Sequence, residues 1–211
     1  MSTTVRTAAA RARSRRQSDE FDPTPWPVAL LCGVVGGACA YFANPPYDLW
    51  MLLPVGLALL SAGLLVRSAW LAALVSLLWG LAFFVPLTEW ANIYAGNVPW
   101  IALGIVEAVY IVLYGLLART VLVRRGLCLS SALVVAALWV AVETLRSTVP
   151  WGGLPWGASA FALADSPLLN LAPWIGMAGL ALVVGLLGQL LLHGALSLLG
   201  RRHRGLVGFS G

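Results

Sequence analysis

The feature that most constrains this chain is a succession of apolar segments, each close to the length that crosses a lipid bilayer. They lie at about 26–42, 49–66, 69–88, 98–120, 127–145 and 174–199. A transmembrane helix needs about 20 predominantly apolar residues. Residues that stop helices separate the segments, such as Pro45 and Pro46 after the first and Arg124 to Gly126 after the fourth. We expect an all-α, polytopic membrane protein with six transmembrane helices.

Composition excludes the main soluble classes. Apolar residues make up 60% of the 211-residue chain and charged residues only 10%. A soluble domain carries about 25% charged residues, which form its polar surface. A soluble enzyme and a disordered protein are therefore both excluded, and the phospholipid bilayer is the expected environment.

The positive charges indicate an orientation. The sequence contains no Lys, so Arg residues supply all 13 positive charges behind the net charge of +5. Under the positive-inside rule, six spans with both termini in the cytoplasm place every Arg except Arg146 on the inner side. We predict this N-in, C-in topology. No motif of a nucleic-acid-binding fold is present, and we expect no nucleic-acid partner.

The domain organisation follows from these spans. Residues 1–25 are predicted to form a disordered, Arg-rich cytoplasmic tail, 26–200 a six-helix transmembrane domain, and 201–211 a basic cytoplasmic tail. The segment 146–173 is too long and too rich in Gly and Pro for a simple hairpin. Because lipid-exposed irregular backbone is not tolerated deep in a bilayer, we expect this segment to be re-entrant or interfacial on the outer face.

Small residues in the first span predict close helix packing. Gly33 and Gly37 have the Gly-x-x-x-Gly spacing that lets two transmembrane helices approach each other closely. We interpret this pair as a packing feature and not as a ligand site.

Carboxylates show the opposite bias to the Arg residues. Five of them map to the outer half of the membrane region or to outer loops: Asp48, Glu89, Glu107, Glu143 and Asp165. Glu107 and Glu143 lie within predicted spans, where a carboxylate is costly unless it is paired or faces a wet cavity. Both are therefore candidate functional residues. Glu143 and Arg146 are three positions apart, and we predict that they form an ion pair.

The residue inventory argues against catalysis by this chain. Cys32, Cys39 and Cys128 show no paired spacing, so we expect neither disulfides nor a metal site, and no cofactor. His193 and His203 lie toward the cytoplasm. The outer face thus offers no Cys, Lys or His for nucleophilic catalysis, and we assign no catalytic residue.

Three stretches resemble the N-terminal membrane half of apolipoprotein N-acyltransferases. They are ANPPYDLW at 43–50, LWVAVETLR at 138–146, and PWGGLPWGASAF at 150–161 followed by SPLLNLAPWIGMAGL at 166–180. A weaker match is EWANIY at 89–94. The order and spacing match throughout, over about residues 26–200.

The resemblance implies an enzyme of the bacterial plasma membrane. Such an enzyme moves an acyl chain from a phospholipid to the N-terminal cysteine of a lipoprotein, on the outer face of that membrane. Its chemistry belongs to a nitrilase-like domain with a catalytic Glu, Lys and Cys. This chain contains no Lys and stops soon after the sixth span. We therefore expect a truncated or split product that is inactive alone and works with a separately encoded nitrilase-like domain.

Candidate positioning residues come from the matched stretches. We predict lipid- or substrate-positioning or structural roles at the outer face for Pro45, Pro46, Tyr47, Asp48, Glu89, Trp90, Glu107, Glu143, Arg146, Trp151, Pro155 and Trp156. Two alternatives stay open. The first is a non-catalytic anchor for a polyprenol-phosphate mannose synthase, a glycosyltransferase found beside actinobacterial members of the family. The second is a six-span subunit of a small-molecule transporter.

Overall fold

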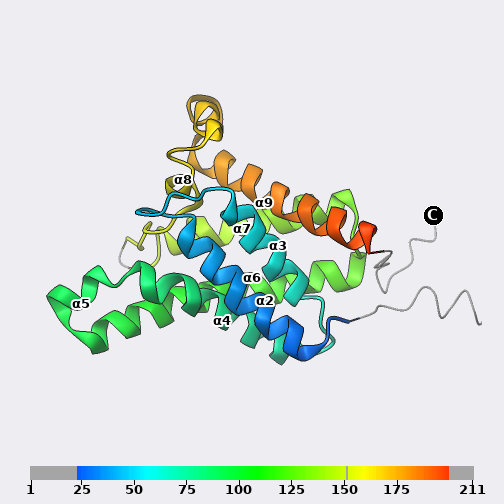
Figure 1. Cartoon of the computed structure of the whole chain (residues 1–211), viewed down its shortest axis with the longest axis horizontal. Coiled ribbons are helices and arrows are strands. Elements are labelled where there is room, and N and C mark those ends of the chain that lie inside the picture. Colours follow the sequence, from blue (N-terminus) through cyan, green and yellow to red (C-terminus); the bar gives the residue numbers. More distant parts are fainter. Residues whose placement is uncertain (1–22, 151, 200–211) are drawn as a thin grey trace, which may run out of the picture.

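The computed structural model describes residues 23–150 and 152–199, and within them it is helical without strands. Figure 1 shows the arrangement. The elements in chain order are α2 (Trp26–Phe42), α3 (Leu52–Gly63), α4 (Ala69–Leu87), α5 (Trp90–Ala95), α6 (Asn97–Arg125), α7 (Leu129–Arg146), α8 (Ser159–Ala162), the 3₁₀ turn η1 (Pro167–Leu171) and α9 (Ala172–Leu198). The predicted all-α fold is confirmed.

Each predicted span contains one main helix, but the helices differ in length. Four stretches are long and apolar enough to cross a membrane: α4, α6, α7 and the run from η1 through α9. The other two helices, α2 and α3, are apolar but shorter, with 17 and 12 residues. The second predicted span, 49–66, is therefore longer than its helix. At about 1.5 Å per residue α3 is only about 18 Å long, and the chain turns at Trp50 and Leu64 on either side of it.

The short helix α3 packs among other helices of the bundle. Leu53, Leu57 and Leu60 are buried on it. A buried polar contact joins it to α9, where the Gln189 amide donates to Ser61 Oγ over 2.7 Å. Such interhelical bonds stabilise membrane bundles because lipid offers the side chains no alternative partner.

Gly33 and Gly37 bring α2 against α4, as the spacing predicted. A Cβ atom at Gly33 would lie 2.7 Å from the carbonyl oxygen of Val75, and one at Gly37 would clash with the carbonyl oxygen of Trp79. Only glycine permits such contact between two helix backbones. The packing role of this pair is confirmed.

Trp79 stands at the centre of the packed core. It is fully buried, and its indole N–H donates to the Gly56 carbonyl of α3 over 3.0 Å. Its ring meets Trp139 of α7 edge-on, with centroids 5.8 Å apart. The central helix α4 is thus tied to its neighbours by aromatic contacts and one satisfied polar group.

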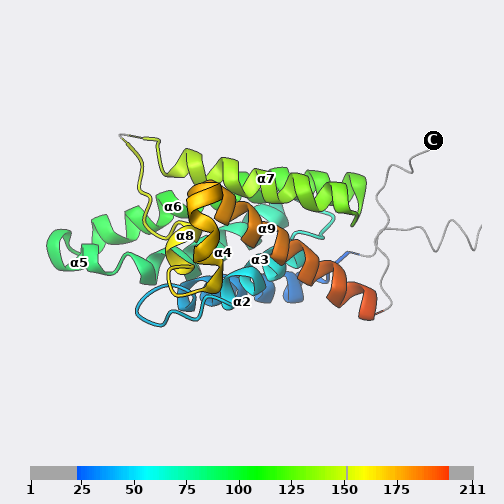
Figure 2. The same ribbon diagram turned by 90° about the horizontal axis from the view of Figure 1, so that it is seen from above.

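The described chain begins and ends at the same end of the bundle. Figures 1 and 2 show the start of α2 and the end of α9 at one end, with α5 at the other. The predicted tails, 1–25 and 201–211, fall outside the described residues except for 23–25. There Thr24 donates from its hydroxyl to the Ala62 carbonyl over 2.9 Å.

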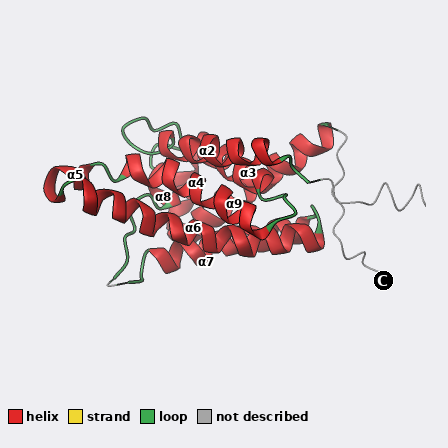
Figure 3. Ribbon diagram, turned by 90° about the horizontal axis from the view of Figure 1, so that it is seen from below, coloured by secondary structure: helices red, strands yellow, loops and turns green. Residues whose placement is uncertain are grey.

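The segment after α7 leaves the bundle and returns to it. Figure 3 shows long loops between α7 and α8, at the end of the bundle where α5 lies. The chain then passes through α8 and η1 and turns into the long part of α9 at Gly176, where φ is 62°. This left-handed conformation is open to glycine and strained for most other residues. The turn lets the preceding stretch take a direction different from that of α9.

Candidate functional site

Arg146, at the last position of α7, is the centre of the site. Its side chain is only 3% exposed, and Nη1 lies 2.9 Å from Oε2 of Glu107 on α6, whose side chain is 4% exposed. The predicted ion pair of Arg146 with Glu143 is therefore wrong. Spacing along one helix suggested Glu143, but the carboxylate that meets the guanidinium comes from the neighbouring helix.

Arg146 also holds the loop that follows α7. Its Nη1 group donates to the carbonyl oxygens of Leu154 and Trp156 over 2.7 and 2.9 Å. The Arg146 carbonyl in turn accepts a bond from the Leu154 amide over 3.1 Å. The guanidinium carbon lies 4.9 Å from the centroid of the Phe84 ring on α4, a favourable cation–π distance. One side chain thus joins α4, α6 and α7 to the segment 147–171, which we call the outer segment after its predicted side of the membrane.

Glu143 binds the same segment at a second point. Its Oε2 accepts from the backbone amide of Ser159 over 2.9 Å and from the Ser159 hydroxyl over 2.6 Å. The Ser159 oxygen accepts in turn from the indole N–H of Trp139 over 2.9 Å. Bonds to a charged acceptor are among the stronger hydrogen bonds in proteins. Glu143 therefore fixes the start of α8 against α7.

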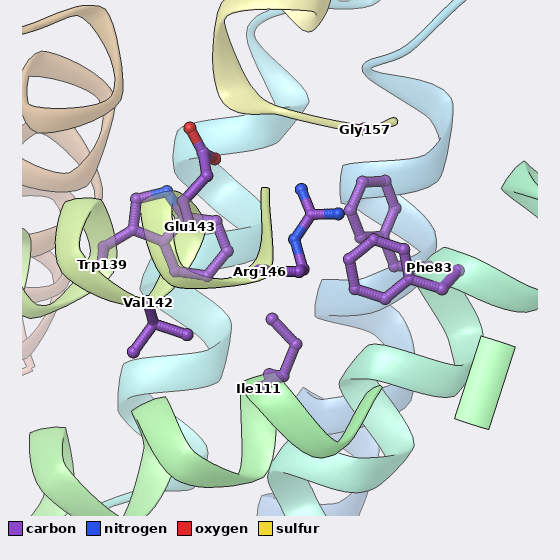
Figure 4. Close-up of a pocket in the computed structure, with 8 residues that line it drawn as sticks. Phe83, Ile111, Trp139, Val142, Glu143, Arg146 and Gly157 are labelled. Carbon is purple, nitrogen blue, oxygen red and sulfur yellow. The ribbon is translucent and has the colours of Figure 1, made fainter. Parts of the chain in front are cut away.

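A small cavity lies between the contacts of Arg146 and those of Glu143, and Figure 4 shows the residues that line it. In that view Arg146 lies between Glu143 on the left and Phe83 on the right, and Gly157 lies above them. The cavity volume of about 10 Å³ matches the space that one water molecule needs. An acyl chain does not fit there. The residues that line it are Phe83, Phe84, Ile111, Trp139, Val142, Glu143, Arg146 and Gly157.

The outer rim of the site adds two contacts. Tyr110 of α6 donates from its hydroxyl to the Val149 carbonyl over 2.6 Å. The rings of Trp90 and Trp156 lie with centroids 5.7 Å apart, and both side chains are more than 40% exposed. These contacts tie α5 and α6 to the outer segment, so it is held from three helices.

The remaining predicted residues that the structure describes do not supply hydrogen-bond partners to Arg146, although Pro155 lies between the two residues whose carbonyls do. Pro45, Pro46, Tyr47 and Asp48 form the turn after α2, where the Tyr47 ring packs edge-on to Phe42 at 4.8 Å. Glu89 and Pro155 are exposed neighbours of Trp90 and Trp156. Trp151 falls outside the described residues.

Sequence reasoning missed the partners that complete the site. Ser159, Trp139 and Phe84 were not predicted, and the carbonyl groups of Leu154 and Trp156 carry no sequence signal. The available hint was Ser159, a polar residue between Ala158 and Ala160 in a segment with almost no charged residues. Within the described residues no group of three or more His, Cys, Asp or Glu side chains is placed to hold a metal ion.

These features define an all-helical membrane domain whose buried polar site fixes the segment between α7 and α9. Comparison with known proteins then names its family. The family model described as the apolipoprotein N-acyltransferase N-terminal domain matches residues 36–190, which include Glu107, Glu143 and Arg146. The chain belongs to the apolipoprotein N-acyltransferase family, and it is a multi-pass protein of the bacterial inner membrane.

Three curated relatives illustrate the match. The apolipoprotein N-acyltransferase of Haemophilus ducreyi is 33% identical over 175 residues, covering 78% of this chain and 33% of that protein. That of Ralstonia nicotianae is 34% identical over 194 residues, covering 88% and 36%. That of Mycolicibacterium smegmatis is 39% identical over 100 residues, covering 46% and 17%. The matched part therefore spans about a third of the first two relatives.

Proposed function

We propose that this chain is the membrane-embedded part of an apolipoprotein N-acyltransferase. In this proposal the complete enzyme transfers an acyl chain from a phospholipid to the N-terminal cysteine of a lipoprotein. The observation that carries the proposal is the family match over residues 36–190, which contains the whole site around Arg146. The partner we propose is a nitrilase-like catalytic domain at the outer end of the bundle.

We also propose six membrane crossings with both termini in the cytoplasm. The distribution of Arg residues supports this orientation through the positive-inside rule. The common end of the bundle at which α2 begins and α9 ends supports an even number of crossings. With this topology Arg146 and Glu107 lie near the outer boundary of the membrane.

The role we propose for the site is to position the outer segment. Glu107, Glu143 and Arg146 bind backbone or side-chain groups of the chain itself, and their cavity has room for a single water. Buried polar groups that are fully satisfied rigidify the structure around them. The segment 147–171 would thus form a fixed outer platform beside which lipid and lipoprotein approach the catalytic domain.

Acyl transfer itself would need groups from the catalytic domain. A thioester intermediate requires a thiolate next to a base and groups that stabilise the oxyanion. Cys128 precedes α7, at the opposite end of that helix from Arg146, and Cys32 lies within α2. Cys39 lies in the last turn of α2, toward the end that this topology places outside, but the sequence contains no Lys to stabilise an oxyanion beside it. We propose that the 211-residue chain alone does not transfer acyl groups.

A chimera tests this proposal. Residues 26–199 would replace the matching region of the Haemophilus ducreyi enzyme, and the product would be reconstituted with phospholipid and a diacylated lipopeptide. We expect mass spectrometry to detect N-acylated lipopeptide with the chimera and none with the 211-residue chain alone. A chimera that is folded and embedded in lipid but inactive would contradict the proposal. Transfer by the chain alone would contradict the role of the catalytic domain.

The two alternatives gain no support from the comparisons. A glycosyltransferase anchor and a transporter subunit remain hypotheses from sequence, whereas the three relatives cited above are all named apolipoprotein N-acyltransferases. We therefore retain the acyltransferase membrane domain as the proposed function.

A further inference from the structure

The stretch that joins the outer segment to α9 does not run with the membrane spans. In Figure 1 the residues coloured yellow to orange before the long part of α9 stand off from the bundle, and in Figure 2 they run across the direction of α7. This stretch comprises η1 and the start of α9, residues 167–177, and it contains the left-handed Gly176 at which α9 changes direction. It therefore turns aside at the outer end of the bundle.

Its exposed large side chains are apolar and are not covered by protein in the described structure, and Asn170, its exposed polar side chain, donates to the Pro167 carbonyl. Trp174 is 86% exposed, and Leu171, Ile175 and Met177 are 40–49% exposed. Leu171, Trp174 and Ile175 have the i, i+3, i+4 spacing that places side chains on one face of a helix. Leu168 and Ala172 pack against the core, so the stretch is fixed to the bundle while these larger side chains project from it.

The scarcity of charged residues around this face, and the apolar surface of α9 that adjoins it, indicate what the face contacts. Between residues 147 and 199 the only Asp, Glu, Arg or Lys is Asp165, which lies in the exposed turn before η1. The apolar surface continues along α9, where Leu190 and Leu191 are about half exposed and face outward from the bundle. Exposure of such a surface to water is unfavourable. At the membrane interface, in contrast, a tryptophan buries its ring and keeps its N–H hydrated.

We propose that residues 167–177 form an anchor that lies along the outer leaflet, with the boundary between lipid headgroups and acyl chains as its partner. The anchor rests on the membrane topology given under Proposed function. Trp174 supplies the central interfacial contact and Leu171 and Ile175 flank it, as in helices that lie in the membrane plane. Through η1 and α8 the anchor fixes the height of the Arg146 site relative to lipid headgroups.

Fluorescence quenching at single cysteines tests the anchor. The full chain, with Cys32, Cys39 and Cys128 replaced by Ala, would carry Trp174→Cys labelled with an environment-sensitive fluorophore. It would be reconstituted in vesicles of phosphatidylethanolamine and phosphatidylglycerol that contain nitroxide lipids. We expect a nitroxide near the glycerol backbone to quench this label at least about twofold more than one deep in the acyl chain, because the anchor lies at the interface.

Two matched positions separate the anchor from the topology on which it rests. Asp165→Cys, two residues before Pro167, should be quenched by aqueous iodide and not by lipid nitroxides. Leu190→Cys, on the outward face of α9, should be quenched best by the deep nitroxide. If Leu190→Cys is not quenched by lipid, the membrane topology is wrong.

Three outcomes at Trp174→Cys would overturn the anchor while Leu190→Cys behaves as expected. Quenching by iodide alone would show that the stretch lies in water. Stronger quenching by the deep nitroxide would show that it re-enters the bilayer. Protection from both quenchers would show that protein covers it. Thermal unfolding of each labelled variant against the cysteine-free parent verifies that the fold is retained.

Discussion

Nη1 of Arg146, at the end of α7, lies 2.9 Å from Oε2 of Glu107 on α6, 39 positions earlier in the chain. Both side chains are almost fully buried, and the same Nη1 group binds two carbonyls of the outer segment. The contact therefore joins two membrane helices and a loop at one point. Its stabilising effect should depend on both partners being present.

The choice of partner can be measured with a double-mutant cycle. Glu107→Gln should lower the unfolding free energy by about 3 kcal/mol, because it leaves a buried guanidinium without its counter-charge. Combining it with Arg146→Gln should cost less than the sum of the two single changes, with a coupling of about 1 kcal/mol or more. Denaturant titration in mixed micelles provides the measurement.

The same cycle with Glu143 is the control. Glu143 binds Ser159, and the ion pair of Arg146 is with Glu107. Because Glu143 and Arg146 line the same cavity, some coupling is expected, but Glu143→Gln should couple to Arg146→Gln less strongly than Glu107→Gln does. A coupling of Arg146 to Glu143 larger than its coupling to Glu107 would contradict the partner assignment.

Removal of the Ser159 hydroxyl should loosen the outer segment. Ser159→Ala deletes a 2.6 Å bond to Glu143 and leaves the Trp139 indole without its acceptor. The loss is worth about 1 kcal/mol or more, so protease cleavage near residues 150–156 should rise about fivefold. Thr148→Val is the matched control, because the Thr148 hydroxyl donates to the Thr144 and Leu145 carbonyls of the preceding helix α7 and not to α8. Equal cleavage of the two variants would show that Ser159 does not hold the segment.

Close packing of α2 and α4 gives a third prediction. Gly37→Ala places a methyl group against the Trp79 carbonyl, and such overpacking costs about 1–3 kcal/mol. Gly194→Ala in α9 meets no atom within 4 Å and should be neutral or slightly stabilising. Thermal melting in one detergent compares the two variants. Equal melting temperatures would mean that the close approach of the helices does not limit residue size.

Cys128 should react faster with maleimide than an ordinary exposed thiol. The Ser130 hydroxyl, 3.1 Å from Sγ, lowers the pKa of the Cys128 thiol. A lower pKa raises the thiolate fraction at neutral pH, and the thiolate is the reacting form. Ser130→Ala should therefore slow labelling near pH 7, and the difference should vanish at a pH where both thiols are ionised. An unchanged pH profile would exclude this role of Ser130.

The helices were predictable because hydropathy and helix breakers act locally. Gly33 and Gly37 could be interpreted correctly for the same reason, since a Gly-x-x-x-Gly spacing has one dominant use in membranes. The length of α3 was not predictable. Its apolar sequence continues through Leu64 to Val66, and the turn at Leu64 depends on how neighbouring helices pack.

Only part of the site could be predicted from the sequence. Because burying a carboxylate in a membrane is costly, Glu107 and Glu143 were correctly identified as residues that need partners. Their partners come from other helices or from backbone groups, as with Glu107 for Arg146 and Ser159 for Glu143. Spacing within one helix suggested a pair between Glu143 and Arg146, but tertiary packing gave each residue a different partner.

The most direct test of the membrane domain proposed here is the sidedness of α7 in intact bacterial cells. Two chains with a single cysteine are compared. One keeps only native Cys128, which precedes this helix, and the other lacks the native cysteines and carries Thr148→Cys at an exposed position just beyond the other end of the helix. A membrane-impermeant maleimide should label Thr148→Cys in intact cells and native Cys128 only after permeabilisation. Labelling of Cys128 from outside, with Thr148→Cys protected, would place the Arg146 site at the cytoplasmic face and contradict the account.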